Sequence, residues 1–226
     1  MTIRMDGRWD IDDLSEFAEG LEGIYGYFCA VFIDDDILRR RIDDLVQTQF
    51  WNRDFEHSYV GERVYQMLPA EAGLRIKSIR YASPGAIEIV GILGVLLLLA
   101  KVVKEWTGAL AGIVETYDKI HAFFEKHRHL RRPPRNFNLG QVSGAEVDEA
   151  RTLMFELGHQ MGLDDTLCNR VLEMAGNPVS GLKFMAALTL QARTVARLGA
   201  RGLLELPSQA VKETPSGPME TRDVRD

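Results

Sequence analysis

An apolar residue recurs at alternating steps of four and three residues over one long stretch of the chain. The ten positions are Ile92, Leu96, Leu99, Val103, Trp106, Leu110, Ile113, Tyr117, Ile120 and Phe124. This spacing keeps the side chains on one side of an α-helix, while Lys101, Lys104, Glu115 and Asp118 fall on the other side. The pattern predicts an amphipathic helix over about residues 89–127, roughly 55 Å long.

The positions that flank this repeat are also mostly apolar or small, as at Leu93, Val95, Ala100, Val102 and Ala109. A two-stranded coiled coil in water usually has charges there, so the helix is expected to pack on several neighbours. Those neighbours can belong to the same chain or partly to a second subunit, and both arrangements stay open. The predicted buried face and possible subunit interface comprises Leu96, Leu99, Val103, Trp106, Leu110, Ile113, Tyr117, Ile120 and Phe124.

Three short segments alternate apolar and polar residues as β-strands do, at 2–8, 74–81 and 86–90. The turn sequence Ser83-Pro84-Gly85 between the last two predicts a hairpin. A hairpin alone is marginal in water, so segment 2–8 is expected to be its third strand and the long helix its cover. The predicted fold class is α+β and predominantly helical: a small antiparallel sheet of two or three strands packed on a long amphipathic helix, followed by a C-terminal helical unit.

Further helices are predicted from their caps and apolar spacing, at about 11–31, 37–51, 54–67, 144–161, 165–175 and 180–204. In the first of these, Gly20, Gly23 and Gly26 lie three residues apart. They indicate either a groove for close helix packing or a weak, interrupted helix. The predicted organisation is an α+β unit over 1–127, a basic proline-containing linker over 128–142, a helical unit over 143–206 and a disordered tail over 207–226.

The charge is unevenly distributed, although the net charge is only −6. Residues 1–62 hold 15 acidic and 6 basic residues, a net charge of −9, and residues 63–142 hold 6 acidic and 12 basic residues, a net charge of +6. These two segments could attract each other within one fold or between subunits. The acidic balance argues against a general nucleic-acid binder.

Neither cysteine belongs to a zinc or catalytic motif, and Cys29 and Cys168 both occupy apolar helical patterns. We expect buried free thiols. No apolar stretch follows a basic start at the N-terminus, so a cytoplasmic location is expected.

Two pairs of residues carry candidate chemistry. Glu156 and His159 lie three apart on one helical face, a spacing that di-iron bundles use in duplicate, but the sequence holds no second copy. His121 and Glu125 lie one turn apart and could interact. No nucleotide-binding or hydrolase motif occurs, so no cofactor is expected and an enzyme has no positive support.

Four arginines follow the long helix, at Arg128, Arg131, Arg132 and Arg135. They form a candidate anion-binding cluster for phosphate, lipid headgroups or an acidic partner. The alternative is a favourable placement of cations near a helix C-terminus.

The leading functional hypothesis is a non-enzymatic interaction or assembly protein that binds a protein partner or a second copy of itself. It uses the long apolar helix face as core and possible subunit interface. The first alternative is a membrane-acting effector that inserts residues 89–100, which are uncharged but shorter than a bilayer is thick. The second is an enzyme or metal protein that uses Glu156 and His159.

Overall fold

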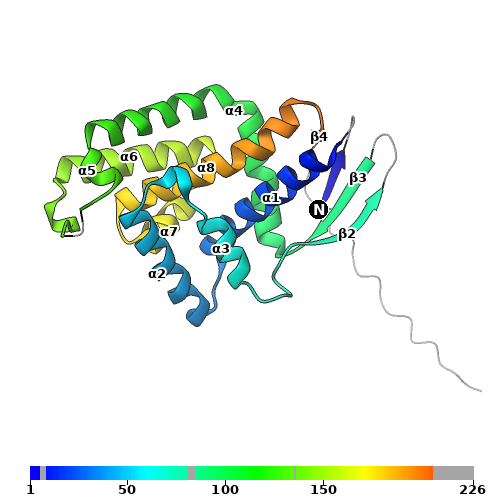
Figure 1. The fold of residues 1–226 in the computed structure, drawn as a ribbon, viewed down its shortest axis with the longest axis horizontal. Coiled ribbons are helices and arrows are strands. Elements are labelled where there is room, and N and C mark those ends of the chain that lie inside the picture. Colours follow the sequence, from blue (N-terminus) through cyan, green and yellow to red (C-terminus); the bar gives the residue numbers. More distant parts are fainter. Residues whose placement is uncertain (6–8, 81–84, 135, 206–226) are drawn as a thin grey trace, which may run out of the picture.

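The structure is a computed structural model that describes residues 1–5, 9–80, 85–134 and 136–205 (Figure 1). Its helices occupy one part of the molecule and its sheet the other. In chain order the elements are β1 (Thr2–Met5), α1 (Ile11–Phe32), α2 (Asp36–Asn52), the 3-10 helix η1 (Phe55–His57), α3 (Val60–Met67), β2 (Arg75–Arg80), β3 (Gly85–Val90), α4 (Leu93–Lys126), α5 (Arg128–Arg131), η2 (Leu139–Gln141), α6 (Gly144–Gln160), α7 (Asp165–Ala175), α8 (Pro178–Ala200) and β4 (Leu204–Glu205).

The sheet confirms the predicted third strand. Its order is β2-β3-β1-β4 and its pairs are antiparallel, with Ile3 opposite Ile87 in the β1–β3 pair. Ile3, Ile87 and Ile89 are buried, so one face of the sheet belongs to the core. The two-residue strand β4 extends the sheet beyond β1 and was not predicted. Together with the helices this is the predicted α+β, predominantly helical fold.

Helix α1 shows why its three glycines recur. Asp10 caps the helix in a capping box with Asp13, and the helix continues unbroken to Phe32. A Cβ atom on Gly20 would lie 3.1 Å from Val195 of α8, and one on Gly26 would overlap the carbonyl oxygen of Gly61 in α3. The glycines therefore form a groove for close helix packing, and the interrupted helix is wrong.

Helix α4 starts four residues later than predicted, because residues 89 and 90 still pair with β2 as the end of β3. The part of α4 that follows β3 runs in a different direction from the part that lies along α6 (Figure 1). Of the nine predicted face residues, Leu96, Leu99, Ile113, Ile120 and Phe124 are buried in this chain, and Tyr117 is half-buried. The side chains of Val103, Trp106 and Leu110 lie outside the described part of the structure.

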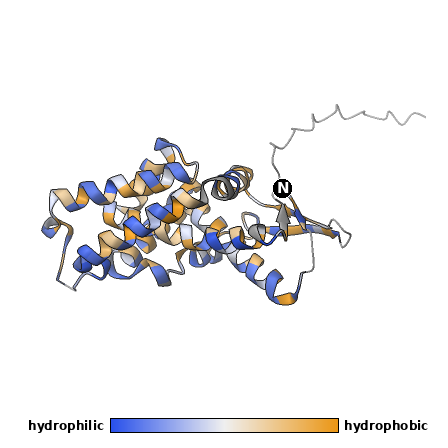
Figure 2. Ribbon diagram, turned by 90° about the horizontal axis from the view of Figure 1, so that it is seen from above, coloured by the Kyte–Doolittle hydropathy of each residue, from blue (hydrophilic) through white to orange (hydrophobic). Residues whose placement is uncertain are grey.

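Helix α8 is the central element of the helical part. It contacts α1, α2, α4, α6 and α7, and residues 179–189 are all buried. Asn177 caps it and Pro178 is its first residue. It ends at Ala200 rather than at the predicted residue 204, because Gly202 takes a left-handed conformation and residues 204–205 turn back to pair with β1. Figure 2 shows hydrophobic and hydrophilic residues interspersed along the surrounding helices, as expected for helices with one buried side.

Some of the other helix ends are as predicted, and others differ from the prediction. The capping box of Ser143 and Glu146 starts α6, and Gly176 ends α7 in a left-handed conformation, both as predicted. The helix predicted over 54–67 is confirmed only for its second part, α3, because η1 is a separate element and Tyr59 between them is exposed. The range predicted as a linker contains α5 and η2, and Leu130 of α5 is buried.

Both predicted units contribute side chains to one connected hydrophobic core, from Phe28 of α1 to Phe184 of α8. Their division into units stays a prediction, and the predicted tail at 207–226 lies outside the described residues.

The two cysteines are free and buried, as predicted. Burial raises the pKa of Cys29 to about 12 and that of Cys168 to about 11, so neither thiol ionises near neutral pH. Among the helices that the structure describes, none combines the length and the apolar composition that crossing a bilayer needs.

Candidate functional site

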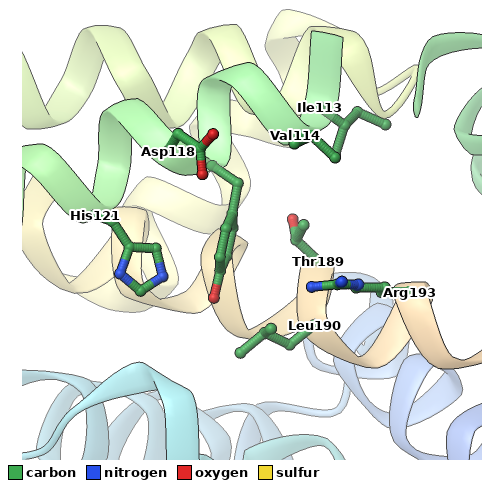
Figure 3. Close-up of a pocket in the computed structure, with 8 residues that line it drawn as sticks. Ile113, Val114, Asp118, His121, Thr189, Leu190 and Arg193 are labelled. Carbon is green, nitrogen blue, oxygen red and sulfur yellow. The ribbon is translucent and has the colours of Figure 1, made fainter. Parts of the chain in front are cut away.

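A pocket of about 310 Å³ opens between α4 and α8 (Figure 3). Its lining residues are Ile113, Val114, Tyr117, Asp118 and His121 from α4, and Thr189, Leu190 and Arg193 from α8. The volume lies at the lower end of the range for small-molecule pockets, about 300–1,000 Å³. The pocket therefore has room for a small ligand.

The pocket combines an apolar wall with charged and polar groups. Ile113 and Thr189 are buried at its inner side, whereas Val114 is half-exposed at its mouth. Figure 3 shows Arg193 on the α8 side of the pocket and Asp118 and His121 on the α4 side. Burial, and then the nearby carboxylate of Glu56, raise the pKa of Tyr117, while Arg193 acts in the opposite direction. The Tyr117 hydroxyl is therefore neutral at physiological pH and can donate a hydrogen bond.

A charged network adjoins the pocket on the side of η1. Glu56 of η1 lies 3.6 Å from the Nε2 atom of His121, and it also accepts a 2.7 Å hydrogen bond from Arg131. Arg131 Nε donates to the buried carboxylate of Asp54 at 2.8 Å, and its NH1 group donates to Glu125. Arg131 thus joins η1 to the end of α4.

Lys183 is the buried cation behind this network. Its side chain is fully buried in α8, and its Nζ atom donates to the carbonyl oxygens of Arg53 and Arg131 at 3.2 and 2.8 Å. It also lies 5.7 Å from the centre of the Phe124 ring. Burial lowers the pKa of Lys183 to about 7, although the nearby Asp54 carboxylate partly opposes this change. A lysine with no exposed surface has a structural role here, because no ligand can reach it.

The predicted anion-binding arginines are placed among carboxylates. Arg131 has three carboxylate partners, Arg128 pairs with Glu125 at 3.2 Å, and Arg132 lies 3.4 Å from Asp54. Arg135 lies outside the described residues. The described members therefore join elements of the fold, and binding of an external anion by the cluster stays a prediction.

The histidines after α4 meet the start of α6. His127 Nδ1 and His129 Nε2 lie 2.8 and 3.2 Å from the same Glu146 oxygen. Glu146 belongs to the capping box of α6, and the Ser143 hydroxyl is the main cause that lowers its pKa. These contacts hold the end of α4 against α6.

The two predicted chemical pairs do not come together. Glu156 accepts hydrogen bonds from Thr116 and Lys119, whereas His159 lies 2.7 Å from Asp165. His121 pairs with Glu56 instead of Glu125. In the described part of the chain no group of three histidine, cysteine or acidic residues is arranged to hold a metal ion.

Two surface regions place charged residues beside exposed apolar side chains. The first, the basic corner, is formed by β2 and the start of α4, where β3 leads directly into α4. Its exposed apolar residues are Ile76 and Ile79, on the face of β2 that carries Ile89 and Ile87 of β3, together with Leu93 and Leu97 of α4. Its exposed basic residues are Arg75 and Arg80, at the two ends of β2 on the other face of this edge strand, and Lys101 of α4. The second, the acidic start, precedes and begins α2 and comprises Asp34, Asp35, Asp36 and Ile37, with the exposed Arg40 one helical turn after Asp36.

Sequence reasoning missed both the pocket and the two surface regions as sites. The residues Thr189 and Arg193 carry no motif, and only the packing of α8 against α4 brings them beside Tyr117 and His121. The charge asymmetry of the sequence was the available signal for the surface regions, but it did not identify the residues. Comparison of the chain with protein families, curated proteins and solved structures finds no match.

Proposed function

We propose that this chain is a non-enzymatic assembly protein whose copies join head to tail, with the basic corner of one copy bound to the acidic start of the next. The proposal rests on two separate surfaces of one chain. Each has at least one large exposed apolar residue, and the charged residues that adjoin it are mainly basic on one surface and mainly acidic on the other.

The basic corner has the properties of a contact surface. Ile76 and Leu93 are 61% and 59% exposed, and Leu97 follows Leu93 one helical turn later. Between residues 74 and 104 the sequence holds five basic residues and one acidic residue, Glu88, which pairs with Lys77. Exposed apolar side chains with a rim of one charge are typical of protein interaction sites.

The acidic start offers the complementary chemistry. Ile37 is 74% exposed at the first turn of α2, directly after three aspartates. The Asp35 carboxylate caps α2 by accepting from the backbone of Ile37 and Leu38, so this turn is held in place. Asp34 and Asp36 are exposed beside it and can face the arginines of a second copy.

A contact between two different surfaces is heterologous, so it generates a ring or an open chain rather than a twofold dimer. Its charged part weakens as salt increases, since the screening length falls from about 30 Å at 0.01 M to about 8 Å at 0.15 M. The proposal therefore predicts assembly that grows with protein concentration and decreases with ionic strength.

Charge reversal on either surface is expected to abolish assembly, and mixing the two reversed proteins is expected to restore it. The first variant carries Arg75→Glu, Arg80→Glu and Lys101→Glu, which makes both surfaces acidic. The second carries Asp34→Lys and Asp36→Lys, which makes both surfaces basic. Light scattering should find each variant monomeric and the mixture assembled, because every contact in the mixture again joins opposite charges.

Leu93→Glu should also abolish assembly, whereas Leu139→Glu, which changes an exposed leucine of η2, should leave it unchanged. A wild-type protein that stays monomeric at low salt and high concentration would contradict the proposal. Assembly only on anionic vesicles would instead support the membrane alternative.

A further inference from the structure

The pocket between α4 and α8 holds two opposite charges that do not neutralise each other. Asp118 and Arg193 both line it and are both exposed, and neither forms an ion pair within the part of the chain that the structure describes. Other arginines at nearby positions are paired, as Arg197 is with Glu16 and Arg201 with Asp13. A cationic and an anionic side chain thus line one small pocket (Figure 3), and each can form an ion pair with a ligand.

The rest of the lining is apolar or neutral. Ile113, Val114 and Leu190 supply aliphatic surface, and Tyr117 supplies an aromatic ring. The Thr189 hydroxyl is occupied, because it donates to the carbonyl oxygen of Met185 at 2.8 Å. The Tyr117 hydroxyl has no hydrogen-bond partner among the described residues and can therefore bind a ligand.

A ligand that satisfies this lining needs a carboxylate, a cationic group and a compact apolar body. The Arg193 guanidinium suits a carboxylate, which it can bind through two parallel hydrogen bonds. Asp118 suits an ammonium group, and the aliphatic wall with the tyrosine ring suits an uncharged side chain. We propose that the pocket binds a free α-amino acid with an apolar side chain, such as leucine or phenylalanine.

The pocket volume of about 310 Å³ agrees with a ligand of this size. His121 lies at the end of the pocket nearest η1, where it joins Glu56. A bound amino acid would therefore be held between α4 and α8 and beside the network that joins η1 to α5. This site is distinct from the two surfaces of the proposed assembly, so either proposal can fail without the other.

Isothermal titration calorimetry with three probes tests the proposal. The probes are L-leucine, 4-methylpentanoate, which lacks the ammonium group, and 3-methylbutylamine, which lacks the carboxylate. We expect L-leucine to bind more than about tenfold more tightly than either analogue, since a hydrogen bond to a charged group contributes about 1.5–3 kcal/mol and each 1.4 kcal/mol is a factor of ten.

Arg193→Gln should weaken L-leucine binding more than about tenfold, and Asp118→Asn should remove the preference for L-leucine over 4-methylpentanoate. Two matched variants control for general charge effects. Arg197→Gln changes the next arginine of α8, and Glu115→Gln changes an acidic residue of α4 outside the pocket; both should leave binding unchanged.

Equal affinity for L-leucine and 4-methylpentanoate would overturn the role of Asp118 and leave a carboxylate site in place of an amino-acid site. Absence of binding to L-leucine and L-phenylalanine at millimolar concentration, with the wild-type protein folded, would overturn the proposal as a whole.

Discussion

Replacing Gly26 with alanine is expected to destabilise the fold by more than about 3 kcal/mol, the upper end of the usual cost of overpacking a core. The cost is high because the added methyl group would overlap the backbone carbonyl of Gly61, and backbone cannot change rotamer to make room. Helix α3 would have to move away from α1, which would also disturb the contact between Tyr27 and Ser58. Urea unfolding followed by circular dichroism measures this loss.

Gly112→Ala is the matched control, because Gly112 also lies inside a helix. The nearest atoms to a Cβ on Gly112 belong to Gln160 at 3.8 Å, which is an ordinary contact. This substitution should stabilise the protein by up to about 1 kcal/mol through the higher helix propensity of alanine. If both substitutions have similar effects, the close approach of α1 and α3 is not as described.

Raising the pH from 7 to 9.5 is expected to stabilise the wild-type protein by about 3 kcal/mol relative to Lys183→Met. The pKa of Lys183 is about 7 in the folded protein and 10.5 in the unfolded reference. Between these values the unfolded chain binds more protons than the folded chain, so stability increases with pH. Below about pH 7 both states are protonated, and the full penalty for the buried charge applies.

Lys126→Met removes an exposed ammonium group and controls for the loss of one positive charge. Unfolding free energies of the three proteins, measured in urea at several pH values, give the comparison. A constant difference between the wild type and Lys183→Met from pH 7 to 9.5 would show that the ammonium group is not desolvated, against the buried position of Lys183 beside Phe124.

The parts of the fold that local chemistry determines could be predicted from the sequence. Asp10, Ser143 and Asp164 cap helices because their side chains accept from backbone amides three residues later, and this requires no distant partner. The apolar repeat likewise identified the buried side of α4, since Leu99, Ile113 and Ile120 are all buried. The alternation in 2–8 identified β1, whose partner is more than 80 residues away.

Features that depend on distant partners could not be predicted. The apolar run that begins at Ile89 fits a strand and a helix equally well. Only the pairing of Ile89 with Ile76 of β2 assigns Ile89 to the sheet. The pocket needs the approach of α8 to α4, so the sequence spacing of Tyr117 and Arg193 carries no signal of it. In the sequence Lys183 looks like an ordinary exposed residue of α8. Its buried position depends on the carbonyl oxygens of Arg53 and Arg131, which come from distant parts of the chain.

The burial of the α4 face changes where a second copy can bind. The sequence predicts this face as core and as possible subunit interface. Five of its six described residues are buried in the same chain, where α4 packs on α6, α8 and α1, and Tyr117 is half-buried at the pocket. Among the α4 side chains that the structure describes, the exposed large apolar ones are others, namely Leu93, Leu97 and Val114. The first two belong to the basic corner and the third to the pocket.

Hydrogen exchange in the isolated and in the assembled protein tests this account most directly. In dilute protein at high salt, the amides of residues 113–124 should already exchange as slowly as the most stable part of the core, because α6 and α8 cover them. Assembly at low salt should then slow exchange in 75–80 and 93–97 and leave residues 113–124 unchanged. Fast exchange of residues 113–124 in the monomer, with protection only on assembly, would show that a second chain covers the α4 face and would contradict the account.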